Sequence, residues 1–449
     1  MVDKDTIVAI ATPPGKGGIG IVRISGKGTG DIMRQLVSTT PVPRFAHFCS
    51  FYGKDDKAID NGLAIYFPGP ASYTGEDVLE LHGHGGQAVL SLLVERAVEL
   101  GARPARPGEF TERAFLNNKI DLLQAEAVAD LIESTSAHAA RSAIRSLEGA
   151  FSKNISVLME GLISVRKHVE CSLDFSEEDA GMFNPKEIYT QLETFIEKIT
   201  ETLAKAKYGV LLQEGLQVTI IGKPNVGKSS LFNLLIGKDA AIVTEIPGTT
   251  RDIVSDRLMV EGMQLQVVDT AGIRHTKDVV ELEGIKRAKS AAENTDIVLL
   301  ITEADRDTDD DEENLLNDFS DTARTILIKN KIDLAGKQAG VAKTEDQQVS
   351  ISLSAKTGEG VELLLQHLRK ILVNTETRED VFIARERHVH ALEQTLEQLN
   401  NSLQYCDLNK AELLAEELRQ AQETLGKITG VFTTEDLLGE IFSGFCIGK

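Results

Sequence analysis

The eight residues GKPNVGKS, Gly222–Ser229, restrict the fold more strongly than any other part of the chain. They match the phosphate-loop pattern GxxxxGKS, follow the apolar run QVTII and precede SLFNLLIG, a helix-forming stretch. In such a strand, loop and helix, backbone N–H groups hold phosphates at the helix N-terminus, Lys228 reaches the terminal phosphates and the Ser229 hydroxyl binds Mg²⁺. The motif therefore predicts an α/β nucleotide-binding domain.

Three further motifs follow the phosphate loop at the ends of apolar, strand-like runs. They are Asp269–Gly272 (DTAG), Asn330–Asp333 (NKID) and Ser354–Lys356 (SAK). Asp269 is expected to hold the Mg²⁺ shell, and Gly272 to sense a γ-phosphate. The Asp333 carboxylate can accept two hydrogen bonds from guanine, a pair that adenine does not offer. The four motifs in this order resemble those of translation-factor-related GTPases, so we expect a Ras-like G domain that binds GTP.

The segment Ile246–Asp252, IPGTTRD, lies where GTPases carry a switch loop. Thr250 is expected to complete the Mg²⁺ coordination while the γ-phosphate is present. Ras-like GTPases place a water-orienting glutamine directly after the DxxG glycine, whereas this chain has Ile273 there. Another group must therefore orient the attacking water. Arg251 and Arg274 are candidate catalytic arginines, and exposed surface arginines are an equally good interpretation.

Composition restricts the cellular setting and the partners. With 449 residues, two to four domains are expected. The four cysteines are far apart and show no metal-ligand spacing, which favours a reducing, cytoplasmic protein, and no apolar run is long enough to cross a membrane. The net charge of −21 would repel a polyanion, so a nucleic-acid substrate would require a local basic patch or a partner protein.

The distribution of apolar, polar and glycine residues along the chain predicts three kinds of structure. Residues 1–118 mix β-type runs with glycine-rich turns and one helical stretch, which predicts an α+β domain. Residues 119–212 and 375–449 show helical periodicity, and residues 213–374 alternate strands with helices. A doubly wound module can be inserted with its ends close together. We therefore expect one split all-α helical domain carrying an inserted α/β domain.

The G-domain motifs also resemble GTPases that are activated by K⁺ and by pairing of two G domains. The resemblance rests on Asn225 in the phosphate loop, on GTTRD and on the apolar residue after DTAG. It implies that K⁺ is held by Asn225, Thr244, Ile246 and Thr249. It also implies that an acidic residue positions water, with Glu281 as the best match and Glu283 as the competitor.

The predicted GTP site draws on all of these motifs. The residues expected to bind GTP are Asn225, Val226, Gly227, Lys228, Ser229, Ser230, Thr244, Glu245, Ile246, Pro247, Gly248, Thr249, Thr250, Asp269, Thr270, Ala271, Gly272, Asn330, Lys331, Asp333, Ser354, Ala355 and Lys356. Lys228, Thr250 and Glu281 are the expected catalytic residues, and Ser229 and Thr250 the expected Mg²⁺ ligands.

Outside the G domain the chain resembles the MnmE (TrmE) family of tRNA-modification GTPases. The stretches that carry the resemblance are DTIVAIATPPGKGGIGIVRISG, YTGEDVLELHGHGG, PGEFTERAFLNNKIDLLQAEAVADLI and the terminal CIGK. It implies an N-terminal domain that binds tetrahydrofolate and dimerises. It further implies a homodimer that acts with an MnmG-type FAD- and NADH-using flavoprotein. Together they would add a (carboxymethyl)aminomethyl group to C5 of the wobble uridine of certain tRNAs, using a folate one-carbon unit.

The resemblance also implies a folate site. Its ligands would be Arg23, Glu80, Lys119 and Lys449, with 5-formyltetrahydrofolate or a related folate as the cofactor. A carboxylate such as Glu80 can accept paired donors from a pterin ring, and Arg23 and Lys119 can hold the carboxylates of a glutamate tail.

Three other patterns have simpler interpretations than their motifs suggest. The sequence GKGGIG at Gly15–Gly20 matches a dinucleotide fingerprint, but the β-type run IVRIS follows it where a helix is required. HGHGG, His82–Gly86, could suggest a metal pair, although a structural turn is the expected role because no third ligand lies nearby. The terminal FCIGK fits a prenylation box poorly. Cys446 is equally compatible with a packing residue and with a reactive thiol.

Two other functions compete with tRNA modification. A GTPase that only docks on ribosomal RNA would usually carry a basic RNA-binding domain, whereas acidic amphipathic helices follow the G domain here. A P-loop ATPase or kinase is disfavoured by the guanine-selective NKID.

Overall fold

A computed structural model describes most of the chain. The residues it does not describe are 1–4, 38, 135, 175–183, 238–254, 261–262, 270–294, 307–323, 344–347, 374–381, 408–409, 432–434 and 449. The described part forms two compact units. The first comprises residues 1–132, 146–200 and 390–449, and the second comprises residues 133–145 and 201–389.

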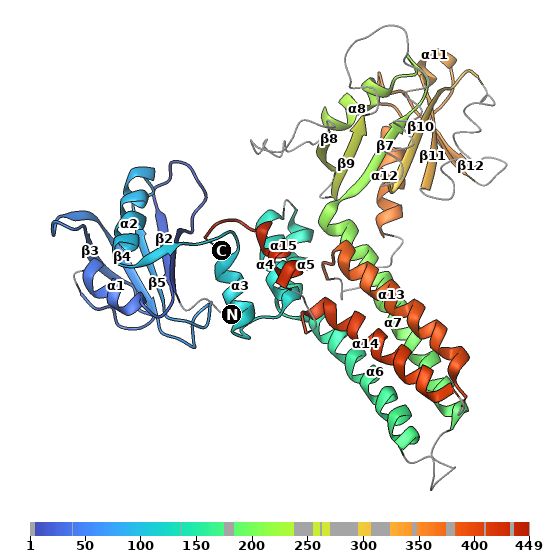
Figure 1. The fold of residues 1–449 in the computed structure, drawn as a ribbon. Helices are drawn as coiled ribbons and strands as arrows, with labels where there is room; N and C mark the ends of the chain where they lie inside the picture. The colour runs from blue at the N-terminus through green and yellow to red at the C-terminus, as the bar shows by residue number, and fades with distance from the viewer. Residues whose placement is uncertain are drawn as a thin grey trace, which may run out of the picture. The chain divides into compact units, whose positions relative to one another are not determined.

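The first unit contains a six-stranded sheet built by the N-terminal residues (Figure 1). Its strands are β1 (Thr6–Ile10), β2 (Gly20–Ser25), β3 (His47–Tyr52), β4 (Ala58–Phe67), β5 (Val78–Gly83) and β6 (Ala102–Pro104). They lie in the order β3-β4-β5-β2-β1-β6, and all neighbours are antiparallel except β1 and β6. The helices α1 (Thr29–Leu36) and α2 (Gln87–Glu99) pack on one face of this sheet.

The two faces of this sheet bury different residues because side chains alternate along a strand. Val8, Val22 and Leu81 join the core under α1 and α2. Ile7 and Ala9 point to the opposite face, where they pack with Phe110 of α3 (Glu109–Leu116). Strand β2 begins at Gly20, the last residue of GKGGIG, which confirms the prediction that no helix follows this glycine pattern.

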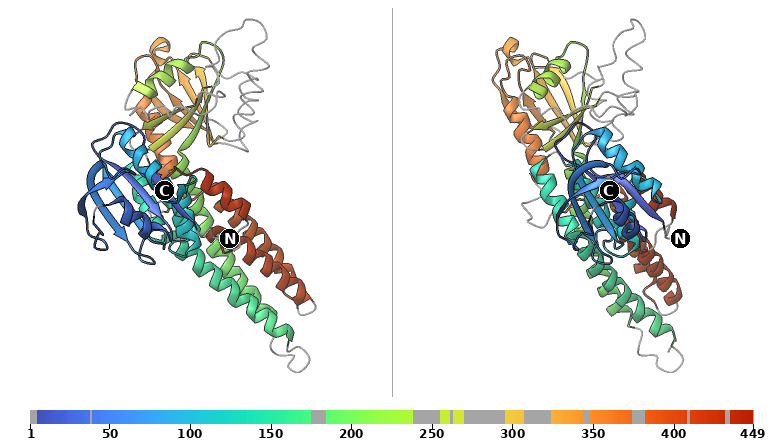
Figure 2. Two further views of the ribbon diagram at one scale, coloured as in Figure 1. Left: turned by 60° about the vertical axis from the view of Figure 1, so that its left-hand side comes forward. Right: turned by 90° about the vertical axis from the view of Figure 1, so that its left-hand side faces the viewer.

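The helical part of the chain contains α4 (Leu122–Glu133), α5 (Ala137–Leu147), α6 (Ala150–Asp174), α7 (Pro185–Glu214), α13 (Glu386–Ser402), α14 (Ala411–Thr429) and α15 (Glu435–Ser443), with the short 3₁₀ turn η1 (Leu403–Tyr405). Most of these helices belong to the first unit, whereas residues 137–145 of α5 belong to the second. α6 and α14 run side by side (Figure 2), and α7 and α13 each continue from one unit into the other. Phe442 and Phe445, at the end of α15 and just after it, pack with Leu122 and Ala125 of α4.

The second unit is an α/β domain with a seven-stranded sheet (Figure 1). Its strands are β7 (Leu216–Ile221), β8 (Ser255–Val260), β9 (Met263–Asp269), β10 (Ile297–Glu303), β11 (Arg324–Asn330), β12 (Gly340–Lys343) and β13 (Val349–Ser352). They lie in the order β12-β13-β11-β10-β7-β9-β8, parallel except at the two edges. The described helices that follow strands of this sheet are α8 (Lys228–Gly237) after β7, α11 (Ile332–Ala335) after β11 and α12 (Val361–Val373) after β13.

The predicted fold classes are confirmed: an N-terminal α+β part, an all-helical part in two segments, and an α/β G domain between them. The domain boundaries at 118, 212 and 374 stay predictions. Among the described residues, no helix is long and apolar enough to cross a membrane.

Candidate functional site

The backbone conformation of the phosphate loop requires glycine at two positions and suits asparagine at a third. Gly222 has φ 148° and Gly227 has φ 105°, and Asn225 adopts φ 65°, a left-handed value that asparagine tolerates better than most residues. A Cβ on Gly222 would lie 2.4 Å from the Ile301 carbonyl oxygen, and one on Gly227 would lie 2.2 Å from Asn330 Nδ2. The glycines of the motif are therefore steric requirements of the loop.

Lys228 is the first residue of α8, and its ammonium folds back over the loop. Its Nζ donates to the carbonyl oxygens of Gly222 at 2.6 Å and Lys223 at 2.8 Å. These bonds hold a positive charge beside the N-terminus of α8, where the helix dipole also favours anions. Ser229 follows at the second helical position, and its side chain is exposed. The geometry is that of a phosphate site with a hydroxyl ligand available for Mg²⁺.

Asn330 connects the phosphate loop to the loop that follows β13. Its Nδ2 donates to the Val226 carbonyl oxygen at 2.8 Å, and its Oδ1 accepts from the Ala355 N–H at 2.8 Å. The side chain is buried, so both bonds are shielded from water. Asn330 therefore acts as a structural bridge that links the motifs GKPNVGKS, NKID and SAK, which follow the parallel strands β7, β11 and β13.

Asp333 lies in the same corner. Its Oδ1 accepts a hydrogen bond from Ser354 Oγ at 2.7 Å, which fixes the direction of the carboxylate. Lys331 takes φ 64° and forms an ion pair with Glu303, and this pair lowers the pKa of Glu303. The corner thus presents one oriented carboxylate, as recognition of paired N–H donors requires.

Asp269 is the last residue of β9 and pairs in register with Ile220 of β7, the strand that leads into the phosphate loop. Its backbone therefore lies at the same end of the sheet as the loop, which is where a residue of the Mg²⁺ shell belongs.

A second polar cluster occupies the face of the N-terminal sheet opposite α1 and α2. Arg23 of β2 and Glu80 of β5 are cross-strand partners, and Nε and Nη2 of Arg23 each lie 2.9 Å from Glu80 Oε1. The other carboxylate oxygen, Oε2, lies 3.2 Å from His82 Nε2. The Arg23 Cζ is 5.8 Å from the ring centroid of Tyr73 and 5.6 Å from that of Phe110. The guanidinium is therefore held by charge and by two aromatic rings.

The C-terminal tail reaches this cluster. Arg23 Nη1 donates to the Gly448 carbonyl oxygen at 3.3 Å, and in Figure 1 the red segment after α15 runs toward the N-terminal sheet. Lys119, in the loop after α3, donates from Nζ to the Pro70 carbonyl oxygen at 3.0 Å. Pro70 belongs to the loop that also carries Tyr73. Three of the four predicted folate residues can thus be placed, Arg23 and Glu80 in direct contact and Lys119 on an adjoining loop.

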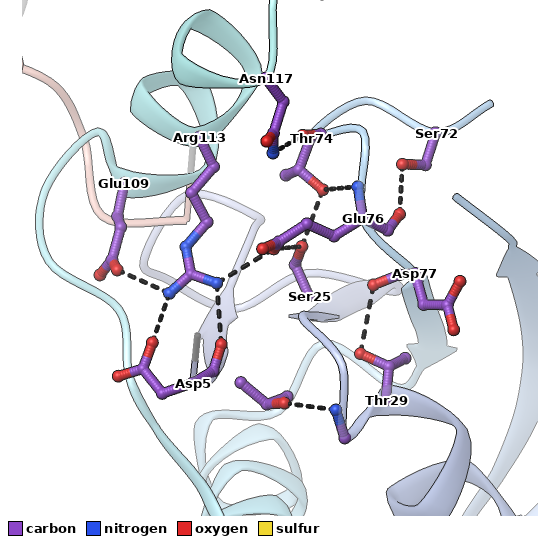
Figure 3. Close-up of polar contacts among 12 residues, drawn as sticks. Asp5, Ser25, Thr29, Ser72, Thr74, Glu76, Asp77, Glu109, Arg113 and Asn117 are labelled. Atoms are coloured by element: carbon purple, nitrogen blue, oxygen red, sulfur yellow. Dashed lines mark hydrogen bonds and ion pairs between the residues drawn. The ribbon is translucent and has the colours of Figure 1, made fainter. Parts of the chain in front are cut away.

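A second ionic network is centred on the buried side chain of Arg113 (Figure 3). Arg113 of α3 donates to Asp5 at 2.7 Å, to Glu76 at 3.0 Å and to Glu109 at 3.0 Å. Ser25, two residues after Arg23 on β2, donates to Glu76 at 3.0 Å. The network therefore ties α3, the loop before β5 and the N-terminus to the strand that carries Arg23.

The charges in this network are mutually stabilised. Burial alone would raise the pKa of Glu109, but hydrogen bonds from Arg103, from the Arg106 N–H and from Arg113 outweigh it and lower the pKa to about 2. Burial also opposes ionisation of Asp5, yet its pKa is lowered by Arg103 and Arg113. The carboxylates of Glu109 and Asp5 are therefore ionised at neutral pH.

The HGHGG segment spans the end of β5, His82 and Gly83, and the short loop of residues 84–86 that leads into α2. His84 Nδ1 and the His84 N–H both lie 2.7 Å from the Asp60 carboxylate. A Cβ on Gly85 would lie 2.5 Å from the Gly17 carbonyl oxygen, so the two glycine-rich segments pack against each other. Within the described residues, no group of three potential metal ligands gathers here or elsewhere.

Comparisons with known proteins agree with this arrangement. The family model "MnmE helical domain" matches residues 122–446, and "GTP-binding protein TrmE N-terminus" matches residues 6–119. A tRNA modification GTPase MnmE from Methylococcus capsulatus is 51% identical over 100% of this chain and 99% of its own.

The chain belongs to the MnmE family.

Other MnmE proteins are nearly as similar. The one from Ectopseudomonas mendocina is 50% identical over 99% of both chains, and that from Hydrogenovibrio crunogenus is 48% identical over 99% of both. Among solved structures, Era from Aquifex aeolicus bound to GDP and AlF₄⁻ is 25% identical over 40% of this chain and 66% of its own, with a TM-score of 0.27.

Several residues predicted for the MnmE-type sites lie outside the described residues. They are Thr244, Glu245, Ile246, Pro247, Gly248, Thr249, Thr250, Thr270, Ala271, Gly272, Glu281 and Lys449, together with the alternatives Arg251, Arg274 and Glu283. Their roles stay predictions.

Sequence reasoning missed the residues that surround Arg23. His82, Tyr73 and Phe110 contact or face the Arg23–Glu80 pair, and none was proposed as part of an MnmE folate site. One signal was present in the sequence, because apolar and polar residues alternate in VLELHG, and Glu80 and His82, two apart, would share a face if this run formed a strand. The rings come from a loop and a helix that only the fold brings to β2.

Proposed function

We propose that this MnmE-family chain binds GTP with Mg²⁺ and hydrolyses it as part of tRNA modification. The observation that carries the proposal is the Asn330 bridge, which joins the phosphate loop to the Ser354–Lys356 loop beside an oriented Asp333. Phosphate recognition and guanine recognition would thereby take place in one hydrogen-bonded corner of the domain. Relatives that are about half identical along the whole chain are tRNA modification GTPases, which supports the proposal.

Each described residue has a defined role in nucleotide binding. The Lys228 ammonium, which lies over the loop carbonyl groups, would turn to the terminal phosphates and neutralise charge that develops there. The Ser229 hydroxyl and, through the metal's shell, Asp269 offer the oxygen ligands that Mg²⁺ prefers. Asp333 would accept hydrogen bonds from the guanine ring N–H and its amino group. Thr250 is proposed to bind Mg²⁺ only in the GTP state.

Hydrolysis is proposed to need K⁺ and a second G domain. Asn225 is exposed, and its left-handed backbone places an amide side chain at the edge of the phosphate loop. An amide oxygen suits K⁺, and a cation there would supply the positive charge that an arginine finger supplies elsewhere. Thr244, Ile246 and Thr249 are proposed as the other K⁺ ligands, and Glu281 as the residue that orients water.

The Arg23–Glu80 cluster is proposed to bind 5-formyltetrahydrofolate or a related folate. Glu80 is partly buried, with Arg23 at one carboxylate oxygen and His82 at the other, and these contacts fix the plane of a carboxylate that would accept paired donors from the pterin ring. Lys119, with Lys449 from the tail, would hold the glutamate carboxylates of the folate. Since Arg23 already contacts Glu80 and Gly448, it has fewer free donors than the sequence suggested, and it would serve the folate partly through them.

The overall reaction is proposed to add a (carboxymethyl)aminomethyl group to C5 of the wobble uridine of certain tRNAs. A homodimer would act with an MnmG-type flavoprotein that uses FAD and NADH, and the folate would supply one carbon. We propose that the flavoprotein contributes to tRNA binding, because the net charge of −21 does not favour a polyanion.

Reconstitution tests the whole proposal. The chain, the flavoprotein, tRNA, GTP and a folate donor are incubated, and the wobble nucleoside is analysed by mass spectrometry. Modified uridine should form with all components, and omission of either GTP or the folate should abolish it. Modification that persists without folate would reject the folate role, and modification that persists with a non-hydrolysable GTP analogue would reject the role of hydrolysis.

A further inference from the structure

The last residues of the chain are held by their backbone. The Gly108 N–H donates to the Cys446 carbonyl oxygen at 3.3 Å, and Ile447 forms an antiparallel bridge with Pro107. The side chains of Cys446 and Ile447 are exposed, the latter by 61%. Burial of these two side chains therefore contributes little to tail docking, which depends instead on the main chain after Phe445.

Gly448 is the residue of this tail whose backbone packs against strand β1. It is buried and has φ 98°, a left-handed value that favours glycine. A Cβ on Gly448 would lie 2.3 Å from the Ile10 carbonyl oxygen and 3.1 Å from the Ala11 Cα. Both obstacles are backbone atoms of β1 and the residue after it, which cannot move aside as a flexible side chain could. A substituent at position 448 would therefore clash and would also strain the backbone.

The same residue touches the proposed folate site. The Gly448 carbonyl oxygen accepts a hydrogen bond from Arg23 Nη1, while Nε and Nη2 of Arg23 hold Glu80. One guanidinium thus joins the tail to the carboxylate.

We propose that Gly448 is a positioning residue: its side-chain-free, left-handed backbone locks the C-terminal tail against Ile10 and Arg23, and this latch sets the geometry of the Arg23–Glu80 folate site. The effect on ligand binding rests on the proposed folate function. The latch itself does not, because it is a property of the chain without ligand.

The test compares Gly448→Ala with the matched control Gly444→Ala in the full-length protein. Gly444 lies in the same tail, but a Cβ added there would meet only the Ile441 carbonyl oxygen, at the ordinary distance of 3.7 Å. Hydrogen exchange followed by mass spectrometry reports tail docking through the Gly108 amide and the last residues. Calorimetry with 5-formyltetrahydrofolate and with GTP reports the two binding sites.

Gly448→Ala should raise the exchange rate of the Gly108 amide by about tenfold or more and weaken folate binding by a similar factor, with GTP affinity unchanged. Gly444→Ala should match the wild type in all three measurements. Lys449→Ala should weaken folate binding while the Gly108 amide stays protected, which separates loss of a ligand from loss of the latch.

If the Gly108 amide of Gly448→Ala exchanges as slowly as in the wild type, the proposed latch is wrong. If it exchanges faster but the affinity for the folate is unchanged, the latch does not position the folate site. If the wild type itself does not bind the folate, the proposed folate function fails, and the exchange data still decide whether the tail is latched by Gly448.

Discussion

Glu109 shows how a single residue depends on its neighbours. Its side chain is almost completely buried, yet donors on Arg103, Arg106 and Arg113 keep it ionised. Its pKa of about 2 lies below the ordinary value of 4.5, so the unfolded chain binds the proton more readily. The resulting stability is present at neutral pH and is lost as the pH falls from about 4.5 toward 2.

Glu109→Gln should therefore lower the free energy of unfolding by about 3 kcal/mol at pH 7, because it leaves buried arginine donors with a weaker acceptor. Urea unfolding of the wild type and of Glu109→Gln from pH 7 to pH 3 measures the free energy of unfolding of each. The difference between these two free energies should become smaller below pH 4.5. Glu112→Gln on the same helix is the control, since burial raises the pKa of Glu112 and its neutral form costs little. Equal losses in the two variants would contradict this explanation of the network.

Asp333 is the residue that we propose selects the base in the nucleotide site. Asp333→Asn should weaken GTP binding by at least about a hundredfold, because an amide presents a donor to the guanine amino group. Xanthosine triphosphate carries a carbonyl group there, so the same variant should bind it better than the wild type does. Competition binding with both nucleotides measures the affinity of the wild type and of Asp333→Asn for GTP and for xanthosine triphosphate. Unchanged GTP affinity in the variant would show that Asp333 does not contact the base.

At the scale of elements, the phosphate loop and β11 depend on each other. A Cβ on Gly227 would lie 2.2 Å from Asn330 Nδ2, and φ is 105°. Gly227→Ala should therefore break the Asn330 bridge and lower GTP affinity by at least about a hundredfold. Gly340→Ala, at the start of β12, should bind GTP normally because an added Cβ would have nothing within 4 Å. Fluorescent-nucleotide titration compares them, and equal affinities would show that the bridge is dispensable.

The elements also show what a sequence can predict. The motifs of the G domain are short and contiguous, and each one follows a strand whose apolar residues reveal it, so their meeting point could be predicted. Arg23 and Glu80 are 57 residues apart, and their contact requires the pairing of β2 with β5. The resemblance to a known family supplied these two residues, whereas no local pattern would have paired them.

The buried network was not predicted for a related reason. Asp5, Glu76 and Arg113 come from three separate segments, and each looks like an ordinary surface charge in the sequence. Only Glu109 and Arg113, four residues apart on α3, gave a local signal, and that spacing is common on exposed helices. Their burial is a property of the assembled unit.

For the whole molecule, we propose a GTP hydrolase in which a cation replaces the missing glutamine and arginine. Asn225 is the proposed K⁺ ligand that lies among the described residues. Ile273, which stands in place of the water-orienting glutamine, is the sequence feature for which another activating group is needed. A G domain that depends on a bound cation must distinguish ions by size.

The most direct test is the rate of GTP hydrolysis by the full-length protein in K⁺ and in Na⁺ at equal ionic strength, with ATP as the comparison nucleotide. We expect GTP hydrolysis to be at least about tenfold faster in K⁺, with no significant hydrolysis of ATP. Equal GTP hydrolysis in both ions would contradict the cation mechanism, and equal hydrolysis of ATP and GTP would contradict the assignment of the site.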